Sequence, residues 1–184
     1  QTLFSASLIA DVLPRIWETN PEAGRQRLDE LRELTRGALA EMRTLLLELR
    51  PSALTDAEMS ELLRQLAESI TGRARVPVDL TIEGSCELPV DVKVALYRIA
   101  QESLNNVAKH AGATQASVRL QAGDEVTLEI VDDGTGFDMD AVPAESLGLG
   151  IMRERAKDIG AELHLDSRVG EGTRVRVRWV NDGS

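Results

Sequence analysis

Glu102, Asn106 and Lys109 stand four and three residues apart in the segment QESLNNVAKH, and this spacing places them along one stripe of a predicted helix. Asn106 offers a neutral oxygen to Mg²⁺, a cation that prefers oxygen ligands. Lys109 offers a cationic donor to phosphate oxygens. Glu102 can orient a metal-bound water or polarise an incoming nucleophile. The stripe suits the edge of a phosphate pocket, although the same spacing also occurs on solvated helix faces.

A second group, Asp132-Asp133-Gly134-Thr135-Gly136, directly follows a predicted strand. Gly134 and Gly136 let the backbone approach a ligand closely and adopt positive φ. The carboxylate of Asp132, at the end of the strand, can accept a hydrogen bond from an exocyclic amine such as that of adenine. The group therefore predicts either a base-binding loop or a plain Asp-Gly turn.

Two further glycine pairs follow in the chain. Gly148 and Gly150 come at the start of a helix predicted over residues 150–159, where free N–H groups and the helix dipole favour anions. Gly172 and Thr173 belong to the stretch GEGT between the last two predicted strands, where a hairpin turn is the alternative. No G-x-x-x-x-G-K-[ST] pattern occurs, so the sequence excludes a Walker loop.

The elements that must position these groups follow from the periodicity of apolar residues. Residues 1 to about 50 predict two helices. Pro14 predicts a kink or break in the first helix, and Asn20 with Pro21 predicts the start of the second. A T-x-x-E capping box predicts that the next helix begins at Thr55. The remaining predicted elements are helix 55–70, strand 76–82, helix 90–111, strands 115–121 and 125–132, helix 150–159, and strands 161–167 and 173–180.

The second helix carries a heptad seam, in which apolar or small residues recur in alternating steps of three and four. The seam consists of Leu28, Leu31, Thr35, Ala38, Met42, Leu45 and Leu49. A lone helical hairpin cannot bury such a seam, so we predict that two chains dimerise into a four-helix bundle. The alternative is that the hairpin folds back onto its own α/β domain. The predicted domains are a dimerisation hairpin, residues 1–52, and an α/β domain, residues 53–184.

The composition excludes several classes of function. The chain carries 31 acidic against 21 basic residues, and its net charge of −10 argues against nucleic-acid binding. Cys86 is the only cysteine, which fits a reducing compartment. The apolar runs are too short to span a membrane. Because the chain begins at Gln1 without a Met, we interpret it as an excised fragment, and a membrane segment in the parent protein is compatible with this interpretation.

In their order and on these elements, the four groups resemble the N, G1, G2 and G3 boxes of the ATPase superfamily shared by gyrase, the heat-shock chaperone, histidine kinases and MutL. The resemblance covers about residues 56–180. The segments QESLNNVAKHAGA and GLGIMRERA resemble the histidine kinases paired with NarL-type response regulators, in which a hairpin ending in LRPSAL precedes the ATP domain. This resemblance implies an α+β protein: half of a dimeric four-helix bundle, followed by a GHKL (Bergerat-type) α/β sandwich that binds ATP.

The resemblance also implies roles for the individual residues. Asn106 would bind Mg²⁺, with Glu102 close to the metal and the γ-phosphate. Lys109 and His110 would contact phosphates. The other implied roles are adenine recognition by Asp132, a base pocket shaped by Gly134 and Gly136, phosphate contacts from Gly148 and Gly150, support behind the adenine by Gly172 and Thr173, and a lid formed by residues 137–147.

As an activity, the resemblance implies transfer of the ATP γ-phosphoryl group to a histidine and then to an aspartate of a response regulator, in the cytoplasm. The acceptor histidine of this group lies in an H-D-x-x-x-Q pattern, and Gln1 resembles its last residue, which helps position water for dephosphorylation. His110 belongs to the nucleotide motif, and the alternation around His164 predicts that it faces solvent. We therefore expect this chain to bind Mg-ATP without phosphorylating itself.

Two other functions remain open at the level of the sequence. One is a non-catalytic module that binds nucleotide and dimerises. The other is an anti-sigma-type serine kinase of the same superfamily, although such proteins lack the long seam of residues 28–49.

Overall fold

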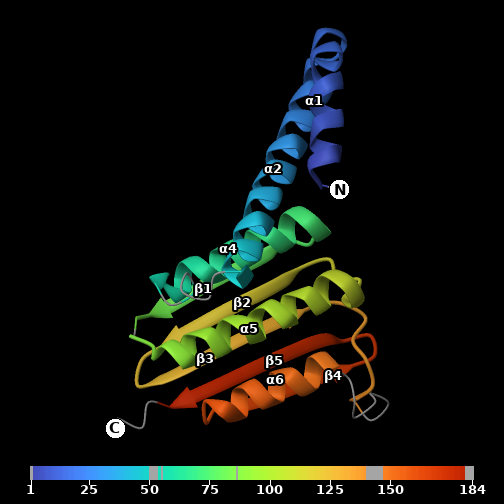
Figure 1. Cartoon of the computed structure of the whole chain (residues 1–184). Coiled ribbons are helices and arrows are strands. Elements are labelled where there is room, and N and C mark those ends of the chain that lie inside the picture. Colours follow the sequence, from blue (N-terminus) through green and yellow to red (C-terminus); the bar gives the residue numbers. More distant parts are fainter. Residues whose placement is uncertain (1, 50–53, 55, 86, 140–146, 181–184) are drawn as a thin grey trace.

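The computed structural model describes residues 2–49, 54, 56–85, 87–139 and 147–180. Two antiparallel helices form a hairpin that extends from an α/β domain (Figure 1). The hairpin consists of α1 (Thr2–Thr19) and α2 (Pro21–Leu49). The α/β domain consists of α4 (Met59–Ala74), β1 (Val78–Gly84), α5 (Val90–Asn106), the π-helical turn η1 (Val107–Ala111), β2 (Ala116–Ala122), β3 (Glu125–Asp132), α6 (Leu147–Asp158), β4 (Glu162–Arg168) and β5 (Gly172–Val180). The domain boundary predicted near residue 52 lies outside the described residues.

The turn between α1 and α2 has the predicted cap. The Asn20 side-chain oxygen accepts a hydrogen bond from the backbone N–H of Ala23 at 3.1 Å, and α2 begins at Pro21. This confirms the predicted start of the second helix, because an N-cap side chain satisfies a backbone donor that the first turn leaves free. The break predicted at Pro14 does not occur, since α1 continues through that residue. The absence of one backbone hydrogen bond is tolerated here because α1 packs along α2.

The hairpin buries only part of its apolar surface in a single chain. Ala38 of the heptad seam is 5% exposed, whereas Met42, one turn later, is 53% exposed. Leu8 and Val12 of α1 are also exposed. The seam predicts such an exposed apolar stripe, because a lone hairpin can bury it only against a partner. The side chains of the last seam positions lie outside the described residues.

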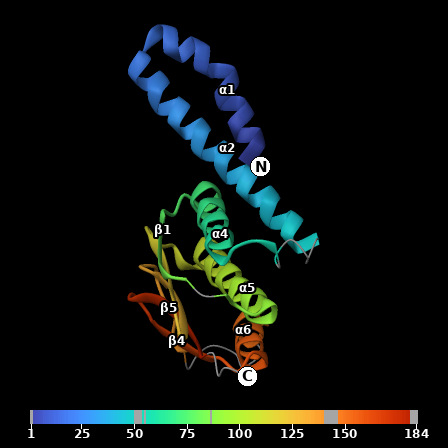
Figure 2. The same ribbon diagram turned by 90° about the vertical axis from the view of Figure 1, so that its left-hand side faces the viewer.

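The hairpin also contacts its own α/β domain, because α2 packs against α4 (Figures 1 and 2). Glu30 of α2 accepts a hydrogen bond from the guanidinium of Arg75 at 3.0 Å. Arg75 ends α4 in the left-handed region with φ of +56°. Part of α2 thus folds back onto its own α/β domain, as the alternative expects, while the apolar side chains of Leu8, Val12 and Met42 stay exposed.

The α/β domain has two layers (Figure 2). The sheet has the strand order β1-β2-β3-β5-β4, with β1 parallel to β2 and all other neighbours antiparallel. Helices α4, α5 and α6 cover one face of the sheet. This is the expected α/β sandwich, in which an apolar sheet face is buried by helices.

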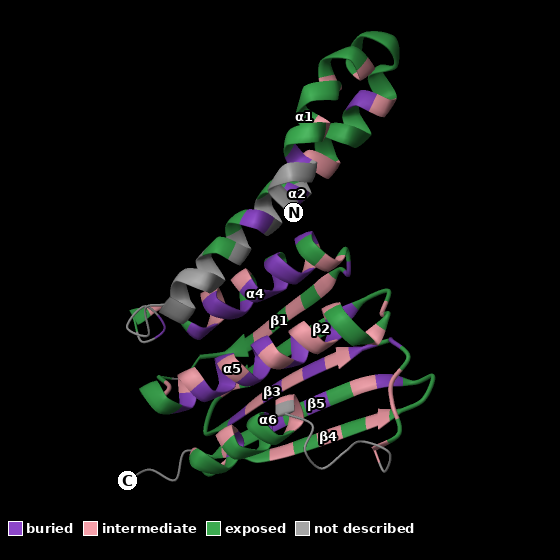
Figure 3. Cartoon of the chain, turned by 45° about the vertical axis from the view of Figure 1, so that its right-hand side comes forward, coloured by how far each residue is buried: buried purple, intermediate pink, exposed green. Residues whose placement is uncertain are grey.

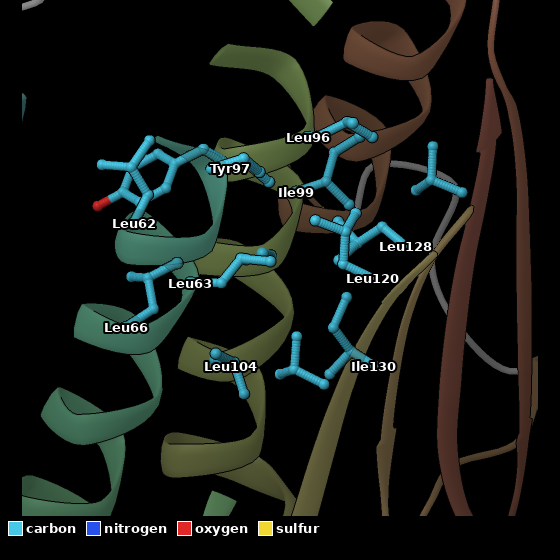
Figure 4. Close-up of a cluster of buried hydrophobic side chains, with 14 of the residues drawn as sticks. Leu62, Leu63, Leu66, Leu96, Tyr97, Ile99, Leu104, Leu120, Leu128 and Ile130 are labelled. Carbon is cyan, nitrogen blue, oxygen red and sulfur yellow. The ribbon is translucent and has the colours of Figure 1, made fainter. Parts of the chain in front are cut away.

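The core lies between these helices and the sheet. Residues alternate along the strands between a more buried and a less buried position, and the central strands β2, β3 and β5 bury one face of the sheet fully (Figure 3). The central side chains are aliphatic, apart from Tyr97 (Figure 4). They include Leu62, Leu63 and Leu66 of α4, Leu96, Ile99 and Leu104 of α5, Leu120 of β2, and Leu128 and Ile130 of β3.

The other face of the sheet is charged and open. Arg176 donates to Glu129, its Nε lying 2.9 Å from the carboxylate, and Arg178 donates to Glu125 at 2.7 Å. The nearby Arg178 guanidinium holds the pKa of Glu125 below its ordinary value. Val175 and Val177 of the same strand are buried on the helix side. Residues therefore alternate along β5 between the helix side and the open face of the sheet.

Several predicted boundaries differ from the structure: α4 runs to Ala74 rather than to residue 70, the strands β1, β2 and β4 are shifted by one or two residues, and three helix ends differ as follows. The helix predicted from Thr55 begins at Met59, because Glu58 is extended with ψ of 140° and makes no side-chain cap. Thr55 itself is outside the described residues. The helix predicted over 150–159 begins earlier, at Leu147, so that Gly148 and Gly150 lie in its first turn. The helix predicted over 90–111 is α-helical only to Asn106 and ends in the π-helical turn η1.

Candidate functional site

A cavity of about 420 Å³ opens between α5, η1 and α6 and the adjoining ends of β3 and β5. Its volume falls in the range of small-molecule pockets. The predicted site residues that line it are Glu102, Asn106, Lys109, His110, Asp132, Gly136, Gly148 and Thr173. Gly134, Gly150 and Gly172 are not in the lining. The structure therefore brings residues from all four predicted groups to one cavity.

The helix α5 and the turn η1 supply the polar wall. Glu102 and Asn106 are half-buried, one turn apart on α5. Lys109 and His110 are exposed at the end of η1, which Gly112 terminates with φ of +58°. A π-helical turn holds more residues per turn than an α-helix, so it changes the direction of the side chains that follow. Lys109 lies in η1 rather than in the α-helix predicted through residue 111, and it still lines the cavity together with Glu102 and Asn106.

Asp132 lies at the end of β3 and is 7% exposed. One carboxylate oxygen accepts the backbone N–H of Gly134 at 2.9 Å. The backbone of Thr173, the residue of β5 that pairs with Asp132, also donates to the carboxylate. Burial raises the pKa of Asp132 above its ordinary value, the two backbone donors oppose this, and the nearby charge of Asp133 adds to it. A carboxylate has about four acceptor positions, so Asp132 can still accept from a ligand amine in the cavity.

The glycines of the second and fourth groups allow backbone segments to come together. Gly136 has φ of +56°, and a Cβ there would collide with the carbonyl oxygen of Arg168. Gly172 has φ of +77°, and a Cβ there would collide with the carbonyl oxygen of Asp132. Gly134 is buried behind the lining. Gly136 and Gly172 favour glycine because other residues rarely adopt positive φ and have no space here, whereas Gly134, expected to adopt positive φ as well, does not and lacks only the space.

The two glycines of α6 differ from each other. A Cβ on Gly148 would overlap the carboxylate oxygen Oε1 of Glu102. The Glu102 carboxylate therefore lies against the first turn of α6, where a helix favours negative charge. Gly150 is exposed, and a Cβ there would meet nothing within 4 Å. Gly150 does not line this cavity, and the phosphate contact expected of it stays a prediction.

Two serines that the sequence did not single out support the site. Ser103 donates to the Ile99 carbonyl at 2.8 Å, and its hydroxyl lies 3.4 Å from the sulfur of Met152, so that it joins α5 to α6. Ser167 accepts the backbone N–H of Phe137 at 3.0 Å and donates to the Gly172 carbonyl at 2.9 Å. Ser103 lies in the segment QESLNNVAKH, but the pattern of that segment indicates no role for it. Ser167 has no local signal, because its partners are remote in the chain.

Two sequence expectations concern residues beside the cavity. His164 is exposed on β4 with its Nε2 3.9 Å from Glu162, which confirms that it faces solvent. Phe137, the first residue of the predicted lid, lines the cavity. Residues 140–146 of that lid, and Gln1, lie outside the described residues.

The donor set bears on whether a metal ion fits. Among the described residues, no group of three or more His, Cys, Asp or Glu side chains could hold a metal ion by themselves. Glu102 and Asn106 together offer one carboxylate and one amide at the cavity. Such a pair fits Mg²⁺, which commonly takes few protein ligands and completes its shell with water and substrate phosphates.

A cavity at this place in a two-layer α/β domain, with a buried aspartate and glycine-dependent turns, is typical of one class of ATPase. A family model described as histidine kinase-, DNA gyrase B-, and HSP90-like ATPase matches residues 91–182. The chain therefore belongs to this ATPase family. A second model, described as histidine kinase, matches residues 1–54, so that within the family the chain belongs to the histidine kinases.

Among curated proteins, the chain is similar to sensor kinases of staphylococci. It is 36% identical over 180 residues to the sensor protein VraS of Staphylococcus haemolyticus, covering 97% of this chain and 51% of that protein. It is 35% identical over 181 residues to the sensor protein VraS of Staphylococcus aureus, with the same coverage of 97% and 51%. The chain thus spans about half the length of the curated relatives that it matches.

Solved structures with low sequence identity share the fold. The histidine kinase domain of the blue-light activated histidine kinase of Erythrobacter litoralis EL346 matches with a TM-score of 0.55 and 20% identity, covering 95% of this chain and 93% of that one. The mycobacterial sensor histidine kinase MprB matches with a TM-score of 0.52 and 21% identity, covering 67% of this chain and 95% of that one. In the part of the chain that the structure describes, no helix combines the length and apolarity that a bilayer crossing requires.

Proposed function

We propose that the chain binds Mg-ATP in the cavity between α5, α6 and the sheet, and that the protein to which it belongs transfers the γ-phosphoryl group to a histidine and then to an aspartate of a response regulator. The proposal rests on one observation: the buried carboxylate of Asp132 lines the same cavity as the ammonium group of Lys109 and the carboxamide of Asn106. An adenine amine and a polyphosphate need these two kinds of partner.

At the base end, Asp132 accepts the adenine amine while its backbone partners hold the carboxylate in place. Gly134, Gly136 and Gly172 let the backbones around it approach, and Thr173 closes the wall beside β5. Because the carboxylate is buried, the discrimination between an amine and a carbonyl is strong: an amine donates to the anion, whereas a carbonyl would bring a second acceptor against it.

At the phosphate end, Lys109 and His110 contact phosphate oxygens from η1, and Gly148 admits them to the first turn of α6. Asn106 and Glu102 hold Mg²⁺ between protein and nucleotide. When bound, this ion neutralises phosphate charge, and phosphoryl transfer depends mainly on such positioning and neutralisation. Glu102 can also polarise an incoming nucleophile and accept its proton.

The hairpin, up to about residue 52, acts in this proposal as a dimerisation unit. Its exposed apolar stripe, including Leu8, Val12 and Met42, fits the same stripe of a second chain in a four-helix bundle. The α/β domain, from about residue 53, is the catalytic ATP-binding unit. We place this part in the cytoplasm, where ATP and response regulators are found, and the parent protein at a membrane as a sensor.

Calorimetry with the 184-residue chain tests nucleotide binding first. We expect one Mg-ATP per chain, with weaker binding when EDTA removes the metal. His110 and His164 are the only histidines of the chain, and neither lies on the hairpin. Incubation with radiolabelled ATP should therefore leave the chain itself without acid-labile label.

The full-length protein tests the transfer. It should gain phosphate that is labile in acid and stable in base, and should pass this phosphate to a response regulator. Tight ATP binding without transfer would favour a non-catalytic module instead, and phosphate on serine of a partner protein would favour a serine kinase.

A further inference from the structure

Asp133, the neighbour of the proposed adenine-binding residue, makes a set of contacts that the nucleotide motif does not require. Its Oδ1 accepts the backbone N–H of Thr114 at 2.8 Å and that of Gln115 at 3.0 Å. Its Oδ2 accepts the hydroxyl of Thr114 at 2.5 Å. These donors hold the pKa of Asp133 below its ordinary value, the Thr114 hydroxyl contributing most. An exposed carboxylate with three intramolecular donors is held in one orientation.

The bonds of Asp133 join two segments that meet at the cavity. One is the turn of residues 112–115, which follows η1, and the other is the end of β3 with residues 133–135. Thr135 strengthens the junction by donating its backbone N–H to the carbonyl of Ala111, the last residue of η1, at 2.7 Å. A Cβ on Gly134 would collide with that same carbonyl oxygen. Several hydrogen bonds therefore hold the end of η1 and the turn after it against the end of β3.

This junction links the two ends of the proposed nucleotide site. Asp132 stands immediately before Asp133 on β3, while Lys109 and His110 stand on η1 just before the tied turn. A π-helical turn is a less regular element than an α-helix, and its own hydrogen bonds hold it less firmly. Lys109 and His110 are exposed, so little packing of their own holds them. Their distance from Asp132 thus depends on the contacts beyond the turn.

We propose that Asp133 is a positioning residue for nucleotide binding: through Thr114 and Gln115 it fixes the phosphate-facing turn η1 relative to the adenine-facing end of β3. The inference rests on the proposed function, since it assigns the phosphates to η1 and the base to Asp132. Asp133 itself does not line the cavity, so it acts through the residues that it holds.

Three substitutions test the role. Asp133→Ala removes all three acceptor contacts. Asp133→Asn keeps an oxygen for the two backbone donors, and its amide can donate to the Thr114 hydroxyl, so it serves as the conservative rescue. Thr114→Val removes only the hydroxyl and keeps the shape. Asp124→Ala is the matched control, because Asp124 is an exposed aspartate at the opposite end of β3.

The affinities of the 184-residue chain for Mg-ATP and for adenosine are measured by calorimetry, together with thermal unfolding. Asp133→Ala should weaken Mg-ATP binding about tenfold, which is the usual effect of removing one charge-assisted hydrogen bond at the phosphate end. Adenosine binding should change less than about twofold, because the base contacts stay on β3. Thr114→Val should give an intermediate loss, and Asp133→Asn and Asp124→Ala should bind Mg-ATP nearly as the unchanged chain does.

The comparison separates this proposal from the one on which it rests. If the unchanged chain fails to bind Mg-ATP, the proposed function fails. If it binds and Asp133→Ala binds equally well, only the positioning role is wrong. Equal losses for adenosine and Mg-ATP, in step with a lower unfolding temperature, would also overturn it, because they would indicate a general loss of folding.

Discussion

Gly148 and Gly150 lie in the first turn of α6 and differ in what a methyl group would meet, so alanine substitutions at the two positions form a matched pair. At Gly148 the added Cβ would overlap the carboxylate of Glu102. At Gly150 it would meet nothing within 4 Å. We predict that Gly148→Ala impairs Mg-ATP binding without unfolding the domain, and that Gly150→Ala leaves binding unchanged.

The magnitudes follow from the atoms involved. Replacing glycine by alanine inside a helix stabilises it by about 0.5–1 kcal/mol, which corresponds to a rise of roughly 1–4 °C for a chain of this size. At Gly148 the overlapping atom is the end of a flexible side chain, so Glu102 rotates away at a cost of about 0.5–1.5 kcal/mol. The folding free energy of Gly148→Ala should thus stay within about 1 kcal/mol of the original. Its Mg-ATP affinity should fall roughly tenfold, as Glu102 leaves its place.

Thermal unfolding without nucleotide and calorimetry with Mg-ATP give the two quantities. A double-mutant cycle with Glu102→Ala shows whether the effect passes through that carboxylate. In the Glu102→Ala background, Gly148→Ala should lose most of its effect on affinity, and only its direct effect on the phosphates should remain. An undiminished effect there would refute the reasoning, because the methyl group would then act on the nucleotide directly. Equal losses from Gly148→Ala and Gly150→Ala would refute it as well.

Three other changes have expected outcomes. Gly172→Ala should lower the free energy of unfolding by about 3 kcal/mol or more, because its Cβ would meet backbone atoms and its φ is positive. Gly170→Ala, also at positive φ but in open space, should lower it by only about 1–2 kcal/mol, and chemical denaturation measures both. Asp132→Asn should weaken Mg-ATP binding about 10- to 100-fold by calorimetry. Without nucleotide, Asp132→Asn should raise the unfolding temperature at neutral pH, because burial raises the pKa of Asp132 and the folded chain must bury its charge. This rise should shrink as the pH falls through the pKa of Asp132 in the folded state, and an unchanged rise at low pH would contradict this cause. Val12→Glu on the exposed stripe should convert a dimer to a monomer in light scattering without changing Mg-ATP affinity, whereas Arg15→Glu, at an exposed charged position nearby, should not.

Elements with strong local signals were predicted well from the sequence. The strand predicted over 125–132 coincides with β3, because buried and exposed residues alternate along it. The start of α2 follows from Asn20 and Pro21, which act within one turn. The buried and open faces of β5 likewise follow from its alternation. In each case the deciding interactions lie within a few residues.

The missed features depend on contacts between remote segments. The turn η1 replaces the end of the predicted α-helix where its backbone meets Thr135, and no periodicity indicates such a contact. The start of α4 at Met59 departs from the capping-box pattern, since Glu58 is extended and makes no side-chain cap. For the site, residue types and order indicated which groups meet. They could not indicate that Gly150 points to solvent or that Asp133 bonds to Thr114, since both depend on three-dimensional placement.

The pairing of Asp132 with Thr173 across β3 and β5 also constrains when the site can form. The whole of α6 and β4 lies between these residues in the chain, so the contact is non-local and its loop must close before it forms. During synthesis the end of the cavity at Asp132, where we propose that adenine binds, is incomplete until β5 has left the ribosome and paired between β3 and β4. If nucleotide binds there as proposed, we expect it to stabilise only the finished domain and not the folding intermediates that lack β5.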